Sequence, residues 1–174
     1  MARSGRVILY IGGARSGKSR LAQTRAESMP NELVYLATAH AGDEEMTERI
    51  TRHRAERGTR WRTVEVPFEL PQELTKNEFA GQVLLVDCLT LWLSNLLLAE
   101  RDVAAAQRDF VSALSVVDAT VLLVTNEVGM GIVPENALAR RFRDEAGRMH
   151  QQIAANAHEV WLVAAGLGLA MKNT

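Results

Sequence analysis

The segment GGARSGKS, residues 12–19, constrains the fold of this chain more than any other stretch. It follows the apolar run RVILYI at residues 6–11 and precedes residues that favour a helix. This arrangement matches the phosphate-loop pattern G-x-x-x-x-G-K-[ST], in which a strand leads into a glycine-rich loop and the loop leads into a helix. The sequence therefore predicts a nucleoside triphosphate site at the end of the first strand.

Each residue type in this loop has a physical role. Gly12, Gly13 and Gly17 let backbone N–H groups converge on phosphate oxygens, where side chains would block the approach. The helix expected to begin near Lys18 adds its partial positive charge to the same anion. Lys18 is expected to reach the β- and γ-phosphates, and the Ser19 hydroxyl to ligate Mg²⁺. The alternative is a glycine-rich turn that carries a Lys-Ser pair by chance.

Apolar runs alternate with helix-compatible stretches along the chain, which predicts an α/β fold with a parallel sheet. The expected class is a P-loop NTPase-like (RecA-like), three-layer fold with a mostly parallel central sheet. With 174 residues and no linker or repeat, a single domain over residues 1–174 is expected. The predicted strands are residues 6–11, 33–37, 61–66, 83–86, 120–124 and 160–164. The predicted helices are residues 18–29, 43–58, 72–79, 89–99, 103–116 and 137–157, and the end that contains Lys172 is predicted to be a tail.

Composition excludes several classes of protein. A formal net charge of −1 argues against a general nucleic-acid binder, which normally carries a basic surplus. Cys88 is the single cysteine, so neither an intrachain disulfide nor a cysteine metal cage is possible. The N-terminal apolar run is too short for a signal peptide, and no stretch is long enough for a membrane span. These features predict a reducing compartment and a cytoplasmic protein.

A candidate metal ligand follows the apolar run VLLV at residues 83–86. Asp87 comes directly after this run, where phosphate-loop enzymes place the carboxylate that holds Mg²⁺. In a parallel sheet this strand would end at the same edge as the phosphate loop, so Ser19 and Asp87 are the candidate metal ligands. The alternative is that Asp87 begins a turn or caps the helix that starts at Leu89.

The predicted helix at residues 43–58 carries an unusual set of side chains. Arg49, His53 and Arg57 are spaced i, i+4, i+8 and therefore project from one side of the helix. The flanking cations would keep His53 neutral and nucleophilic, and the arginines would attract phosphate. The alternative is a solvated basic helix face, which is commoner for a charge run when spacing alone is considered.

Other polar groups have weaker signals. Glu127 lies in the loop of residues 126–136, at the carboxyl end of a predicted strand, as a candidate base or metal-linked group. The alternative is a loop shaped only to start the following helix. His40 could approach the nucleotide, whereas His150 and His158 receive no role. The segment at residues 89–99 is apolar on nearly every side, which indicates a core helix or a core helix that also forms an oligomer interface.

Seven segments taken together resemble one family, the bifunctional adenosylcobinamide kinase/adenosylcobinamide-phosphate guanylyltransferases of cobalamin biosynthesis. The phosphate loop alone indicates only a nucleotide binder, whereas its combination with the other segments is specific. The matching segments are GGARSGKS (12–19), VYLATA (34–39), DEEMTERITRHRAERG (43–58), WRTVE (61–65), LLVDCLTLWLSNLL (84–97), TNEVGMGIVPEN (125–136) and EVWLVAAGLGL (159–169).

The resemblance implies two reactions. In the first, ATP or GTP phosphorylates the hydroxyl of the aminopropanol arm of adenosylcobinamide. In the second, His53 attacks the α-phosphate of GTP, and the histidine-bound GMP passes to adenosylcobinamide phosphate. The resemblance also implies a homotrimer, and the net charge argues against a nucleic-acid partner. The GTP-contacting positions that it implies are Gly12, Gly13, Ala14, Arg15, Ser16, Gly17, Lys18, Ser19, Ala37, Thr38, Ala39, Arg54, Ala55, Glu56, Arg57, Glu65 and Asp87.

Two other functions compete with this one. The first is a P-loop small-molecule kinase without the guanylyltransferase step, in which His53 is incidental. The second is a non-catalytic GTP switch, which normally reads guanine through an N-K-x-D motif. Residues 125–128 read TNEV and do not form that motif.

Overall fold

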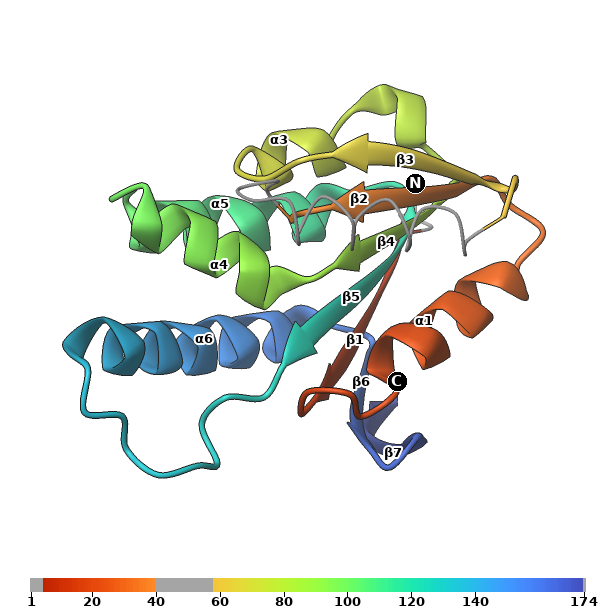
Figure 1. The fold of residues 1–174 in the computed structure, drawn as a ribbon. Coiled ribbons are helices and arrows are strands. Elements are labelled where there is room, and N and C mark those ends of the chain that lie inside the picture. Colours follow the sequence, from red (N-terminus) through yellow and green to blue (C-terminus); the bar gives the residue numbers. More distant parts are fainter. Residues whose placement is uncertain (1–4, 40–57, 174) are drawn as a thin grey trace.

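The computed structural model describes residues 5–39 and 58–173 of the chain (Figure 1). The predicted helix at residues 43–58 lies outside the described residues except for its last position, Gly58. The elements are β1 (Arg6–Gly12), α1 (Lys18–Glu27), β2 (Leu33–Ala37), β3 (Trp61–Glu65), α3 (Leu70–Leu74), the 3-10 helix η1 (Asn77–Phe79), β4 (Val83–Asp87), α4 (Leu89–Leu98), α5 (Val103–Val116), β5 (Thr120–Asn126), α6 (Ala137–Asn156), β6 (Glu159–Ala164) and β7 (Leu167–Asn173).

The strands form one sheet in the order β3-β2-β4-β5-β1-β6-β7. All neighbouring pairs are parallel except β6 and β7, which are antiparallel. The predicted α/β fold with a mostly parallel sheet is therefore confirmed. The predicted C-terminal tail is wrong, because this segment forms β7 and makes β7, not β6, the edge of the sheet. Ala165 and Gly166 both have positive φ, at 51° and 78°, so a two-residue turn reverses the chain at this point.

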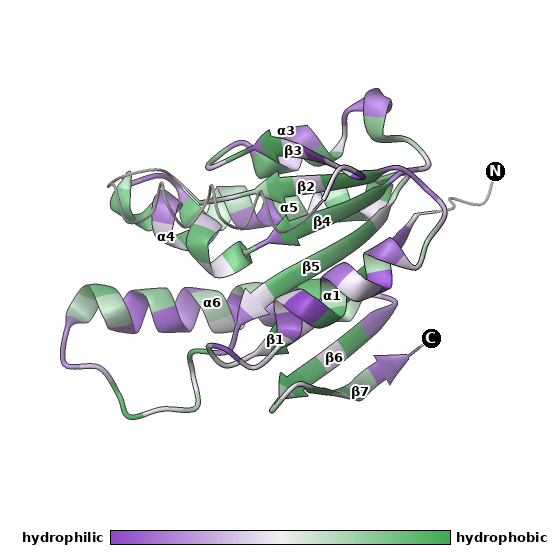
Figure 2. Ribbon diagram, turned by 45° about the vertical axis from the view of Figure 1, so that its right-hand side comes forward, coloured by the Kyte–Doolittle hydropathy of each residue, from purple (hydrophilic) through white to green (hydrophobic). Residues whose placement is uncertain are grey.

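Two layers of helices cover the two faces of the sheet (Figure 1). Successive residues of a strand point to opposite faces, so Ile8 and Tyr10 of β1 pack with α1 in one cluster. Val7 and Leu9 pack in a second cluster with α3, α4, α5 and α6. Figure 2 shows the central strands β4 and β5 as almost continuously hydrophobic, as expected for strands buried on both faces.

Helix α4 belongs to the core, as both of its interpretations predicted. Six of its ten residues are buried within the chain, and Trp92 packs against Phe110 of α5 with ring centroids 5.2 Å apart. The indole N–H of Trp92 donates to the carbonyl of Phe68 at 2.8 Å, so this buried polar group is paired. Leu98 remains exposed at the end of the helix. These contacts show how most of the apolar side chains of α4 are covered within the chain.

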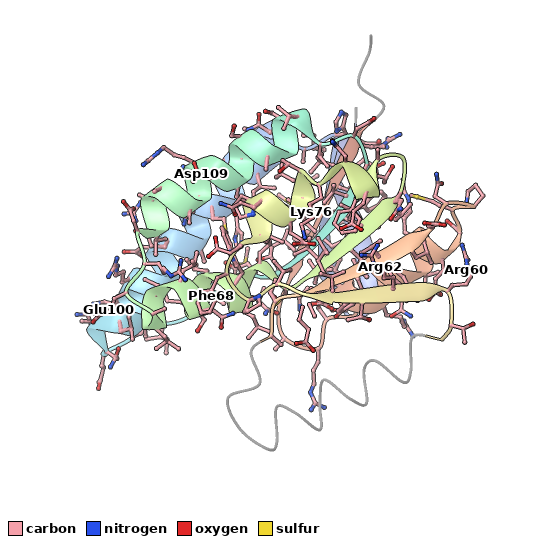
Figure 3. All side chains as sticks on the ribbon, turned by 90° about the horizontal axis from the view of Figure 1, so that it is seen from above. Arg60, Arg62, Phe68, Lys76, Glu100 and Asp109 are labelled. Atoms are coloured by element: carbon pink, nitrogen blue, oxygen red, sulfur yellow. The ribbon has the colours of Figure 1, made fainter. Side chains whose placement is uncertain are left out.

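The connection between β3 and β4 differs from the single weak helix predicted at residues 72–79. It forms the short helix α3 and then η1, and Pro71 lies in the first turn of α3, where the missing N–H has no cost. Figure 3 shows Arg62 along β3 and Phe68 in the connection to α3. Arg62 pairs with Glu78 at 3.0 Å and lies over the ring of Phe79, 5.5 Å from its centroid, which holds η1 against β3.

A buried carboxylate fixes α1 against the sheet behind the phosphate loop. Glu159 at the start of β6 is 2% exposed and pairs with Arg25 of α1 at 2.9 Å and with Arg6 at 2.8 Å. The indole N–H of Trp161 donates to the same carboxylate at 2.8 Å. Burial opposes ionisation of Glu159, but these donors outweigh it and hold the pKa of the carboxyl below its usual range.

Candidate active site at the carboxyl edge of the sheet

The parallel strands bring most of the predicted site residues to one edge of the sheet. Ala37 at the end of β2 is level with Glu65 at the end of β3 and with Asp87 at the end of β4. Gly12 at the end of β1 is level with Asn126 at the end of β5. Ligands of open α/β sheets bind at this carboxyl edge. The structure therefore places residues 12–19, 37–39, 65 and 87 along the same edge.

The phosphate loop has the conformation that its glycines predict. Gly17 has a φ of 96° and immediately precedes α1, which begins at Lys18 as expected. A side chain at Gly12 would collide with the carbonyl oxygen of Val163 on β6. Gly13, in contrast, has open space where a Cβ would stand, so its backbone is free for the approach of a phosphate.

Lys18 connects the loop with Asp87. Its side chain is 7% exposed, and Nζ donates to the carbonyl of Gly13 at 3.0 Å. Burial lowers the pKa of Lys18, and the negative charge of Asp87 acts in the opposite direction. The two charges are thus near enough to interact. In phosphate-loop enzymes such a lysine and carboxylate act on the same triphosphate–metal group.

Ser19 and Asp87 have the chemistry that magnesium requires. A hydroxyl and a carboxylate are hard oxygen ligands, and Mg²⁺ in nucleotide sites is held by one or two such groups together with phosphate oxygens and water. Among residues 5–39 and 58–173, no group of three or more His, Cys, Asp or Glu residues could hold a metal ion by itself. The residues present therefore fit a metal that binds together with the nucleotide.

The hydroxyl of Ser16 also indicates a phosphate ligand. Ser16 is 8% exposed, and its Oγ is buried without a hydrogen-bond partner within the part of the chain that the structure describes. Leaving a buried hydroxyl unpaired costs about 1–3 kcal/mol, so such groups usually have a specific explanation. A phosphate oxygen in the loop would supply the missing partner.

A hydrogen-bonded layer below this edge holds the ends of β2 and β4 together. The Thr38 hydroxyl donates to the carbonyl of Cys88 at 2.7 Å and accepts the Cys88 N–H at 2.9 Å. Asn95 of α4 donates to the carbonyls of Thr38 at 2.8 Å and Pro67 at 3.0 Å. Thr38 is fully buried, and its side chain holds the segment after β2 against the segment after β4. The sequence analysis did not predict a role for Asn95. Its position as a polar residue within the apolar helix LTLWLSNLLL could have indicated a buried hydrogen-bonding group.

The β5–α6 loop uses its polar groups to fix its own shape. Both carboxylate oxygens of Glu127 accept backbone N–H groups, from Gly129 at 2.7 Å and Met130 at 3.1 Å. Asn136 caps α6 by accepting the N–H of Ala139 at 3.0 Å. These contacts favour the structural alternative for Glu127 over a role as a base.

His150, for which the sequence predicts no role, is a half-buried residue of α6 that contacts β5. Its Nε2 lies 2.8 Å from the hydroxyl of Thr125, near the end of β5. Burial lowers the pKa of His150 to about 4, although the nearby Glu127 carboxylate acts in the opposite direction. The imidazole is therefore neutral near pH 7, and the Thr125–His150 pair joins α6 to the strand that ends beside the phosphate loop.

This shifted pKa predicts a specific acid sensitivity. Because the folded-state pKa of about 4 is below the unfolded value of 6.5, His150 contributes to stability above pH 6.5 and that contribution is lost as the pH falls from 6.5 to 4. The loss should amount to about 2–3 kcal/mol. Urea unfolding at pH 7 and pH 4.5 should show a smaller pH difference in His150→Gln than in the unsubstituted chain. Equal pH differences would contradict the assignment.

Some predicted site residues cannot be placed. His53 and the adjoining positions Arg54, Ala55, Glu56 and Arg57 lie outside the described residues, as does His40. Their roles stay predictions. The sheet brings residues 12–19 and Asp87 to the same edge.

The fold and site together define a P-loop NTPase-like protein. A glycine-rich loop joins β1 to α1, a buried lysine follows it, and a carboxylate ends a nearby parallel strand. A solved structure of a protein from Pyrococcus horikoshii OT3 has a similar fold, with a TM-score of 0.57 and 8% sequence identity over 97% of this chain and 86% of that chain.

In the described residues, no helix is both long and apolar enough to cross a membrane.

The chain belongs to the cobinamide kinase / cobinamide phosphate guanyltransferase family, whose model matches residues 8–171. The bifunctional adenosylcobalamin biosynthesis protein CobP of Pseudomonas aeruginosa is 46% identical over 166 residues, which cover 94% of this chain and 96% of that protein. The corresponding protein CobU of Salmonella typhimurium is 43% identical over 181 residues, covering 95% and 99%. The predicted family is thus confirmed, and membership in it implies an enzyme with nucleotide substrates.

Proposed function

We propose that this chain phosphorylates adenosylcobinamide with ATP or GTP and then transfers GMP from GTP to adenosylcobinamide phosphate. The observation that carries the proposal is the near full-length relationship to bifunctional proteins of adenosylcobalamin biosynthesis. The carboxyl edge of the sheet also supports it, because Lys18 contacts Gly13 of the phosphate loop and interacts electrostatically with Asp87. A small-molecule kinase would explain the phosphate loop, but it would not explain why the chain matches the bifunctional family over residues 8–171.

In the first reaction, the hydroxyl oxygen of the corrinoid arm bonds to the γ-phosphorus, and the bond from that phosphorus to the bridging oxygen breaks. The nucleoside diphosphate leaves, and the hydroxyl proton passes to solvent. Lys18 and the loop N–H groups stabilise the charge on the phosphate oxygens. Ser19 and Asp87 are the residues that would hold Mg²⁺, which supplies further charge neutralisation when it is bound.

In the second reaction, a ring nitrogen of His53 bonds to the α-phosphorus of GTP and pyrophosphate leaves. A phosphate oxygen of adenosylcobinamide phosphate then displaces the histidine and yields adenosylcobinamide-GDP. Glu65 offers a reason for the choice of guanine, because it is exposed at the end of β3. Its carboxylate can accept the two N–H donors on the Watson–Crick edge of guanine, whereas adenine has an acceptor at the corresponding ring nitrogen.

The proposal includes an assembly and a location. A homotrimer would cover some of the exposed large apolar side chains, such as Ile132 in the β5–α6 loop or Leu167 on β7. Light scattering after size exclusion is expected to give three times the mass of the chain. We further propose a single domain over residues 1–174 that acts in the cytoplasm.

Two labelled nucleotides test the function directly. GTP labelled at the α-phosphate is expected to leave a covalent label on the protein that is labile to acid and stable to alkali. GTP labelled at the γ-phosphate is expected to leave none, because pyrophosphate carries that label away. In a separate assay, adenosylcobinamide and ATP should give adenosylcobinamide phosphate by mass spectrometry. Phosphorylation without any α-label would favour the small-molecule kinase instead.

A further inference from the structure

We infer that the purine of the kinase donor lies against the β6–β7 turn and Arg20, on the opposite side of the phosphate loop from the guanosine that is transferred to His53. The inference rests on the proposed function and adds a base subsite to it. The turn consists of Ala165 and Gly166 between the paired residues Ala164 and Leu167. One phosphate loop would then hold two nucleotides in opposite directions.

The direction of the kinase donor follows from the order of the strands. The loop follows β1, and Asp87 follows β4, which is two strands away across β5. Ser19 and Asp87 are the residues that would hold Mg²⁺, which would neutralise charge at the terminal phosphates. Because Asp87 ends β4, the γ-phosphate would then lie on the side of the loop that faces β4. The α-phosphate and the nucleoside must then leave the loop on its other side. On that side of β1 lie β6 and β7.

The guanylyl donor needs the reverse direction. Ala37 and Glu65 are expected to contact GTP, and they end β2 and β3, on the far side of β4 from the loop. Neighbouring strands lie about 4.8 Å apart, so the four steps from β1 to β3 span about 19 Å. A guanine near Glu65 therefore directs its α-phosphate toward β3, away from the β6–β7 turn. A single orientation cannot serve both reactions.

The β6–β7 turn is built against the loop where the kinase donor would leave it. The N–H of Gly166 donates to the carbonyl of Ser16 at 2.7 Å. A Cβ at Gly17 would lie 3.0 Å from the Cα of Gly166, so the two backbones are in contact. The Ser16 carbonyl therefore points toward the β6–β7 turn. Along this edge of the sheet, the turn is the part of the chain that lies directly beside the phosphate loop.

Arg20 completes the surface. It follows Ser19 in the first turn of α1 and is exposed, and a Cβ built at Gly166 would lie 3.5 Å from its Nη2. A planar guanidinium beside a turn without a side chain at Gly166 offers a stacking surface for a flat ring. Such a surface makes no use of the donors and acceptors on the base edge. It would therefore accept adenine and guanine alike, in contrast to Glu65.

A paired substitution tests this subsite. Asn tolerates positive φ, so Gly166→Asn keeps the turn and its N–H while it adds a side chain next to Arg20. The KM for ATP in cobinamide phosphorylation should rise about tenfold, the scale of one lost base-stacking contact. The KM for GTP in covalent labelling should change less than about twofold. Gly81→Asn is the matched control, because Gly81 has a φ of 73° and open space at the opposite edge of the sheet.

The reverse selectivity is expected for Glu65→Gln, which should raise the KM for GTP in labelling and leave the KM for ATP in phosphorylation unchanged. Equal loss in both reactions with Gly166→Asn would show a damaged loop and overturn the subsite, as would equal behaviour of Gly166→Asn and Gly81→Asn. Cross-linking with 8-azido-ATP locates the purine without turnover. Label in residues 159–173 supports the inference even if the proposed reactions fail, and label confined to residues 58–69 overturns it.

Discussion

A Lys18→Ala variant is expected to lose both phosphoryl transfer and guanylyl transfer, each by at least about 10²- to 10³-fold. Both reactions need the triphosphate held in the loop, and Lys18 is the buried cation that faces Asp87 across this edge. Cobinamide phosphorylation with ATP and covalent labelling with α-labelled GTP measure the two losses separately. Retention of either activity would show that the corresponding nucleotide does not depend on this loop.

The fold should survive this substitution. Burial lowers the pKa of Lys18, which shows that the folded chain gives up solvation of the ammonium group. Removing the side chain therefore relieves one cost while it breaks the hydrogen bond to Gly13. Thermal unfolding should change by only a few degrees. Arg108→Ala, at an exposed position of α5, is the control and should retain both activities.

Much of the fold could be predicted because the sheet is buried on both faces. Such strands appear in the sequence as short apolar runs, and the predicted run at residues 33–37 became β2 without any change. Helix α5 also matches its predicted bounds, since Asp102 caps it by accepting the N–H of Ala105. The phosphate loop could be predicted because its function depends on backbone geometry, which restricts the residue types at each position.

The rest depended on contacts between segments far apart in the sequence. An exposed edge strand such as β7 lacks the apolar run of a buried strand, so the sequence predicts a tail for the end that contains Lys172. Nothing near His150 in the sequence indicates that it would contact Thr125, which lies 25 residues away. Likewise, the contact of Gly166 with Ser16 joins the two ends of the chain. These pairings appear only when the sheet order is known.

His53 lies outside the described residues, so its role is best decided by chemistry. A phosphate loop and a metal can promote attack on the γ-phosphorus without it, whereas a covalent GMP intermediate needs a nucleophile within reach of the α-phosphorus. The two activities should therefore separate when this side chain is removed. The separation distinguishes the bifunctional enzyme from a kinase in which His53 is incidental.

A His53→Ala variant is expected to lose all covalent label from α-labelled GTP while it keeps at least part of its cobinamide phosphorylation. The label is lost because a methyl group cannot form a bond to phosphorus, and the kinase survives because Lys18, Ser19 and Asp87 remain. His40→Ala is the matched control, since it removes another histidine from the same stretch and should keep the label. Mass spectrometry of the labelled peptide should place GMP on His53. If His53→Ala abolishes both activities equally, the histidine supports the whole site and the division of labour proposed here is wrong.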